Sequence, residues 1–230
     1  MKKEEFPSKI IFALITIMIL IKIFDAIFNP NKTFSGRTAA FLWIEIITVT
    51  ILGLLGSFLY KKIKLPELNR INKKAILTSA LYGIGFGILF VTYDSIAKIG
   101  YMSVGFPLSI IFYIWGAITS EVIFRLFAIS LFVFLISNFL FKKKYNKQVY
   151  WTGAVILSLI TAISMLMAFT NPEIPLNKPT PILYATLGIL VFASEIFSFK
   201  LLKKNGFLSP LTFRLSFYLI WHIIWPPLFY

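Results

Sequence analysis

Long apolar runs alternate with short polar stretches along the whole chain. A membrane-spanning helix needs roughly 20 mostly apolar residues, and six or seven runs reach that length. They cover approximately residues 10–28, 39–60, 75–96, 106–141, 149–169, 181–199 and 207–229. The pattern predicts an all-α, polytopic transmembrane helical bundle of about seven spans.

The run over residues 106–141 is much longer than the others. At 1.5 Å per residue, its roughly 36 residues would form a helix about 54 Å long, whereas the hydrocarbon core of a bilayer is about 30 Å thick. We therefore expect this helix to tilt, to break or to project into the cytoplasm. Small residues in two other runs, Gly53 and Gly56 in one and Gly83, Gly85 and Gly87 in another, favour close helix contacts.

Composition supports lipid as the solvent of this chain. Hydrophobic residues make up 58% of the sequence and charged residues 14%, a ratio that a water-soluble domain of this size could not cover with polar surface. The formal net charge is +14, but the basic residues gather in alternate loops. This positive-inside pattern predicts a multi-pass protein of the cell membrane with a cytoplasmic N-terminus, and it disfavours a nucleic-acid partner. The basic clusters are Lys2, Lys3 and Lys9; Lys61, Lys62, Lys64, Arg70, Lys73 and Lys74; Lys142, Lys143, Lys144 and Lys147; and Lys200, Lys203 and Lys204.

The chain has no cysteine and a single histidine, His222. A disulfide framework, a thiolate metal site and a cysteine nucleophile are therefore excluded, and one histidine gives little support for a transition-metal site. We expect no metal and no other cofactor. The first apolar run lacks a clear small-x-small cleavage site, so we interpret it as a retained helix.

Charged residues inside the predicted spans are informative, because an ionisable group in hydrocarbon is unfavourable unless it is paired or hydrated. Lys22 is expected to pair with Asp25 or with Glu45, and Asp25 and Asp94 to reach an interface. Two interpretations remain open for Glu195 and Arg214: they form an interhelical pair, or with Glu45 they line the polar path of a transporter or channel subunit.

Glu121 and Arg125 form the sharpest local signal. Their i,i+4 spacing puts both side chains on one helix face and allows a charge-assisted bond. His222, in a helix rich in aromatic residues, is interpreted as a hydrogen-bonded structural residue.

The segment 120–127 (SEVIFRLF), followed by 218–222 (YLIWH), resembles the CPBP family, also called Abi. This family includes the prenyl-protein CAAX endopeptidases and bacteriocin-immunity proteins. The resemblance covers about residues 106–226. It implies a division into three N-terminal spans, residues 1–105, and a CPBP-like core of about four spans, residues 106–230.

The resemblance implies site residues, with departures. The first family motif, Glu-Glu-x-x-x-Arg, matches at Glu121 and Arg125, but Ser120 replaces its first glutamate. The second motif ends in a histidine, where this chain has Ser164 or Met165. The third motif matches at His222, but its following Asn or Asp is replaced by Pro226.

These replacements remove the groups that the family uses to activate water. A general base must accept a proton near neutral pH, which the Ser120 hydroxyl cannot do, and proline has neither a side-chain donor nor a backbone N–H to stabilise an oxyanion. The leading hypothesis is therefore a catalytically degenerate CPBP-like protein that binds a hydrophobic peptide, a lipidated segment or a membrane partner. The alternatives are an active endopeptidase with a rearranged site, including a Ser120 nucleophile activated by His222, and a transporter or channel subunit.

Overall fold

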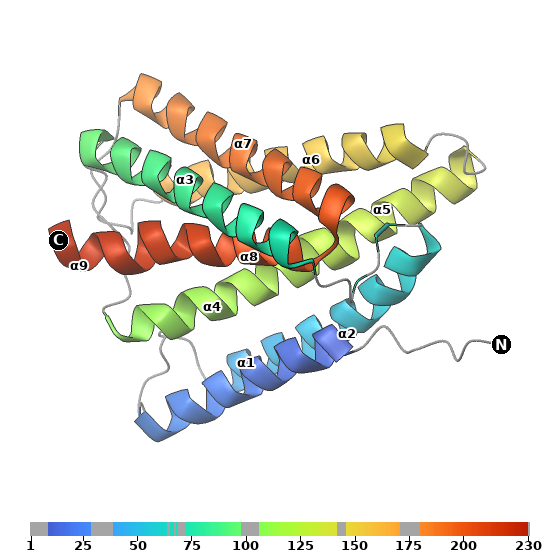
Figure 1. The fold of residues 1–230 in the computed structure, drawn as a ribbon, viewed down its shortest axis with the longest axis horizontal. Helices are drawn as coiled ribbons and strands as arrows, with labels where there is room; N and C mark the ends of the chain where they lie inside the picture. The colour runs from blue at the N-terminus through green and yellow to red at the C-terminus, as the bar shows by residue number, and fades with distance from the viewer. Residues whose placement is uncertain are drawn as a thin grey trace.

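The computed structural model describes residues 9–28, 39–63, 65–66, 68, 72–97, 106–141, 146–170 and 180–229, and helices are the regular elements in these ranges. The helices are named as in Figure 1, with η for π-helical segments. They are α1 (Lys9–Phe28), α2 (Ala39–Lys62), α3 (Lys73–Ala97), α4 (Leu108–Ser120), η1 (Glu121–Ala128), α5 (Ile129–Leu135), η2 (Ile136–Leu140), α6 (Asn146–Thr170), α7 (Pro181–Asn205), α8 (Leu208–Tyr218), η3 (Leu219–Ile224) and α9 (Trp225–Phe229).

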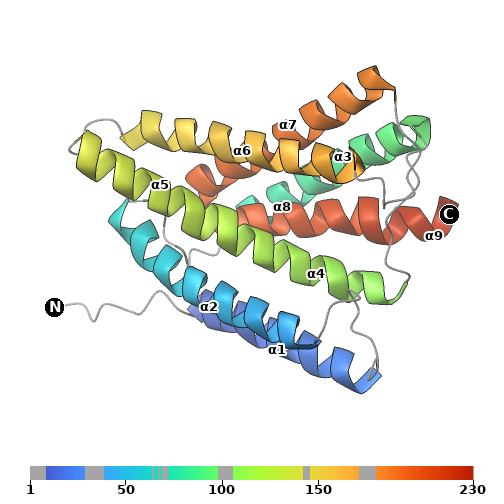
Figure 2. The same cartoon turned by 180° about the vertical axis from the view of Figure 1, so that it is seen from behind.

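Six helices in the described part of the chain are long and apolar enough to cross a membrane. The seventh, which runs from α8 through η3 to α9, lies among them in the bundle (Figures 1 and 2). Arg214 and His222 make this helix more polar than the others. The prediction of an all-α, polytopic bundle is confirmed, and the protein is a multi-pass membrane protein.

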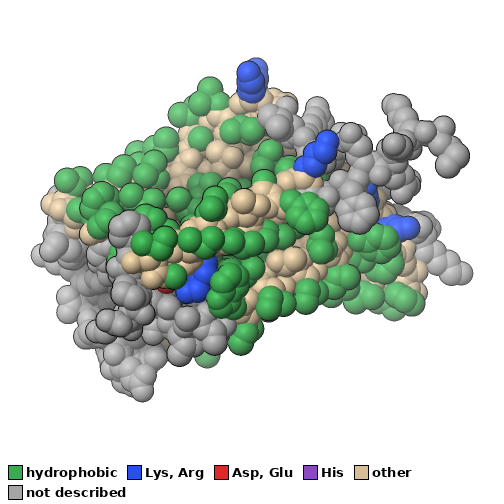
Figure 3. Space-filling view, turned by 90° about the horizontal axis from the view of Figure 1, so that it is seen from below, with side chains coloured by type: hydrophobic (Ala, Val, Ile, Leu, Met, Phe, Trp, Pro, Cys, Tyr) green, Lys and Arg blue, Asp and Glu red, His purple; other side chains and the backbone are tan. Residues whose placement is uncertain are grey.

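The surface of the bundle is suited to lipid. Large hydrophobic side chains such as Ile27, Ile96 and Ile189 are exposed, and Figure 3 shows hydrophobic side chains over most of the described surface in that view, with few Lys or Arg. Successive helices run in opposite directions, so α1, α3, α6 and α8 begin at one end of the bundle (Figures 1 and 2). This is the end that the positive-inside pattern predicts to be cytoplasmic.

The long fourth span forms one helix without a break. It extends over 33 residues, Leu108–Leu140, or about 50 Å at 1.5 Å per residue, and it runs diagonally across the bundle (Figure 2). Its α-helical hydrogen bonding is interrupted by π-helical turns. At the end of η1, for example, the Ile129 N–H donates to the Phe124 carbonyl, five residues earlier. Such turns are rare and are frequently found at functional sites.

Glycines bring the helix backbones together, as predicted from the sequence. A Cβ atom added at Gly83 of α3 would lie 2.3 Å from the Phe213 carbonyl oxygen of α8, and one added at Gly56 of α2 would lie 2.9 Å from the Leu126 backbone of η1. Gly85 is the exception, because a Cβ atom there would have no neighbour within 4 Å. These contacts fix α2 against η1 and α3 against α8.

Buried hydrophobic residues form two clusters. The larger one includes Val122 of η1 and Phe199 of α7, and the smaller one includes Val191 of α7 and Phe217 of α8. Four buried charged residues lie on η1, α7 and α8. On α7, Glu195 falls between Val191 of the smaller cluster and Phe199 of the larger one.

Candidate functional site

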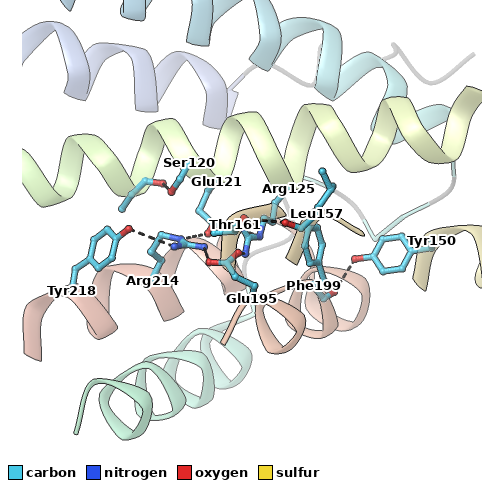
Figure 4. A network of polar contacts seen from close by, with 11 residues as sticks. Ser120, Glu121, Arg125, Tyr150, Leu157, Thr161, Glu195, Phe199, Arg214 and Tyr218 are labelled. Atoms are coloured by element: carbon cyan, nitrogen blue, oxygen red, sulfur yellow. Dashed lines mark hydrogen bonds and ion pairs between the residues drawn. The ribbon is translucent and has the colours of Figure 1, made fainter. Parts of the chain in front are cut away.

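The π-helical segment η1 carries Glu121 and Arg125 into the interior of the bundle. Both side chains have no exposed surface. The η1 segment lies against α2 through Gly56, and Figure 4 shows that the two side chains point from the long helix toward α7 and α8. Their spacing predicted an ion pair between them. The shortest contacts of both side chains, however, are with residues of other helices.

Arg214 of α8 connects two buried carboxylates. Its Nε donates a hydrogen bond to Oε1 of Glu121 at 2.5 Å, and its Nη2 donates to Oε1 of Glu195 on α7 at 2.8 Å. Arg125 completes the arrangement, because its Nη2 donates to Oε2 of Glu195. We call Glu121, Arg125, Glu195 and Arg214 the charge network (Figure 4).

The expected bond between Glu121 and Arg125 is weaker than predicted. Their closest charged atoms, Oε2 of Glu121 and Nε of Arg125, are 3.7 Å apart, and no hydrogen bond joins them. The reason is that Arg214 and Glu195 offer shorter contacts across the helix interfaces. The Arg125 guanidinium also lies over the ring of Phe199, 4.6 Å from its centroid.

The charge network holds two carboxylates and two guanidiniums, so its net formal charge is zero. This balance is what allows four charges to remain in the interior, because a buried ion without a partner is strongly destabilising. The pair of Glu195 and Arg214, one of the two interpretations open from the sequence, is present. Glu45 is half-buried on α2 and does not belong to the charge network.

Ser120 and the two alternatives Ser164 and Met165, singled out from the sequence, are not members of the charge network. The Ser120 hydroxyl is adjacent in sequence to Glu121 but donates to the Ala117 carbonyl of its own helix, at 3.1 Å. Ser164 is exposed on α6, and Met165 is half-buried against the smaller hydrophobic cluster.

His222 is held by aromatic rings in the π-helical segment η3. Its imidazole is stacked on the ring of Tyr113, with centroids 4.1 Å apart and planes 11° apart, and Trp221 lies 4.2 Å from it. Tyr218 lies 5.0 Å away on the next turn, and its hydroxyl accepts a hydrogen bond from Nη1 of Arg214 at 3.4 Å. His222 therefore reaches the charge network through Tyr218.

Three other charged residues within the spans, Lys22, Asp25 and Asp94, have polar partners. Lys22 and Asp25 are buried and form the expected i,i+3 ion pair at 3.8 Å. Asp94, near the end of α3, is buried, and its Oδ2 accepts a hydrogen bond from the indole N–H of Trp225 at 2.9 Å. The contact of Asp94 joins α3 to α9, next to Pro226.

Sequence reasoning missed the aromatic members of this region and the contacts of Glu121 with Arg214 and of Arg125 with Glu195. Arg214, Tyr218 and His222 follow one another at intervals of four residues, which places them along one helix face. That spacing could have predicted that these three side chains lie next to one another. No sequence pattern indicated that Tyr113 would contact His222.

The described residues contain no group of three or more His, Cys, Asp or Glu side chains placed to hold a metal ion. Comparison with known proteins gives no match: no family model, no curated protein and no solved structure is similar to this chain.

Proposed function

We propose that this multi-pass membrane protein is a catalytically inactive, CPBP-like protein that binds a hydrophobic peptide, a lipidated segment or a partner's membrane span. The observation that carries the proposal is that both buried carboxylates face arginines: Glu195 accepts hydrogen bonds through both oxygens, and Glu121 accepts one through Oε1, with its Oε2 3.7 Å from Nε of Arg125. A general base must lie within hydrogen-bond reach of the proton it removes, and both carboxylates are buried in the bundle and oriented toward guanidiniums.

The serine at the first motif position supports the same proposal. Ser120 donates its hydroxyl proton to a carbonyl of its own helix, an arrangement common for serines in apolar helices. The exposed position of Ser164 also offers no substitute for a second-motif histidine. What remains is a helical scaffold whose buried charges balance to zero, which suits recognition through its apolar surfaces rather than hydrolysis.

Binding can be measured directly with the purified protein in lipid nanodiscs. The probes are a fluorescent farnesylated CAAX-type peptide, the same peptide without the farnesyl group and a hydrophobic helical peptide. We expect saturable binding of at least one of the two hydrophobic probes above the level of empty nanodiscs, and none of the unmodified peptide. Signals equal to those of empty nanodiscs for every probe would contradict the proposal.

A further inference from the structure

Lys203, in the last turn of α7, has an unusual environment. Its ammonium lies over two aromatic rings of α6, 4.6 Å from the centroid of Tyr150 and 5.2 Å from that of Trp151. The Nζ atom is enclosed and has no hydrogen-bond partner among the residues that the structure describes. The ammonium has three N–H donors, and aromatic faces satisfy its charge only in part.

The rings that hold Lys203 are fixed. Tyr150 is buried, and its hydroxyl donates to the Phe199 carbonyl of α7 at 2.8 Å (Figure 4). The ring of Trp151 stands edge-on to that of Tyr150, with centroids 5.7 Å apart. Trp151 itself is only half-buried. This aromatic pair therefore forms a preformed wall beside Lys203, whose side chain is half-buried as a whole.

The charge around Lys203 is positive. Lys147 at the start of α6 acts on it electrostatically, and Lys200 and Lys204 are exposed nearby on α7. The described acidic residues all lie on other parts of the bundle or are paired within the charge network; they are Asp25, Glu45, Asp94, Glu121 and Glu195. An enclosed cation without an oxygen acceptor is unfavourable, and the surrounding charge favours an anionic acceptor over water.

We propose that Lys203, Tyr150 and Trp151 form a binding site for the phosphate group of an anionic phospholipid. The site lies where α6 begins and α7 ends, the end assigned to the cytoplasm, and Tyr and Trp are enriched at this depth of a membrane. The four-carbon stem of Lys203 is flexible, so its ammonium can turn from the rings toward a phosphate oxygen while the stem remains against them. Lys147 adds attraction for the same anion.

Native mass spectrometry tests the site with the full chain, purified from mixed micelles that contain equal amounts of phosphatidylglycerol and phosphatidylcholine. We expect the wild-type protein to retain phosphatidylglycerol preferentially. Lys203→Gln should reduce that preference about tenfold, as expected for the loss of a charge-assisted hydrogen bond. Lys204→Gln, an exposed lysine one residue away, removes the same charge and should change the preference less than about twofold.

Two further arms, Lys147→Gln and inorganic phosphate, and one comparison of the variants above complete the test. Lys147→Gln, which removes an exposed charge and no packing, should weaken the preference by an intermediate factor even if Lys203→Gln fails to fold. Equal loss in Lys203→Gln and Lys204→Gln would overturn the site in favour of general attraction to basic residues. Inorganic phosphate should neither displace the lipid nor raise the melting temperature; protection by free phosphate equal to that by phosphatidylglycerol would overturn the lipid as the source of the phosphate.

Discussion

Glu121 on η1 accepts a hydrogen bond from Arg214 on α8, 93 residues further along the chain. Arg214 also binds Glu195, and Glu195 binds Arg125, so the charge network joins three helices. A buried network of this kind is compatible with stability only while every charge keeps its partner. Its integrity is therefore the first property to test.

Arg214→Gln removes the guanidinium that the two glutamates share. We expect the free energy of unfolding to fall by about 3–5 kcal/mol, because two buried carboxylates lose an ionic partner. Thermal melting in mild detergent measures the change. Lys200→Gln removes an exposed cation and serves as the matched control, with an expected change of less than about 1 kcal/mol. Equal melting temperatures for the two variants would show that the charge network does not stabilise the bundle.

Gly83→Ala tests the close contact between α3 and α8. The added Cβ would meet the Phe213 carbonyl oxygen at 2.3 Å, and we expect destabilisation by about 1–3 kcal/mol from overpacking. Gly85→Ala is the control on the same helix, where the added atom meets nothing and the higher helix propensity of alanine should stabilise by up to about 1 kcal/mol. Opposite signs of the two shifts in melting temperature are the predicted result, and a shared sign would contradict the packing.

We predict that His222 contributes by stacking its ring on Tyr113 and that the proton of its imidazole is not required. His222→Phe should retain the stacking on Tyr113 and melt within about 1 kcal/mol of wild type, whereas His222→Ala should lose the stack and at least about 1–2 kcal/mol more. Peptide binding in nanodiscs should follow the same order. Loss of binding in a stably folded His222→Phe would show that the imidazole nitrogens are required.

The absence of native cysteine makes the orientation directly measurable. Thr180→Cys, just before α7, and Lys204→Cys, in its last turn, place single thiols at opposite ends of one span. A membrane-impermeant maleimide added to intact cells should label Thr180→Cys at once and Lys204→Cys only after permeabilisation. The reverse order would invert the assigned topology.

The sequence predicted the helices well because each span is a long apolar run, and lipid leaves few alternatives to a helix for such a run. It also identified Glu121, Arg125 and the pair of Glu195 with Arg214. It did not indicate that Glu121 pairs with Arg214 and Arg125 with Glu195, since these contacts depend on how the bundle packs around Gly56 and Gly83. A local pattern favoured Glu121 with Arg125, but their contact is long because Arg214 and Glu195 compete for it.

The sequence also did not indicate which side of a helix faces the core. Ser164 and Met165 were equivalent candidates on the sequence, and only the packed bundle shows that Ser164 is exposed while Met165 contacts the core. Asp94 was expected at an interface because it is near a span end. Its burial depends on the indole of Trp225, a partner that no spacing rule connects to it.

The central claim is that the carboxylates of the charge network hold the bundle together and do not hydrolyse a peptide bond. The most direct test is mass spectrometry of a farnesylated CAAX-type peptide incubated with the purified protein in liposomes. We predict that the peptide is recovered intact from wild type and from Glu121→Gln alike. Cleavage products that form with wild type and are absent with a folded Glu121→Gln variant would contradict the claim.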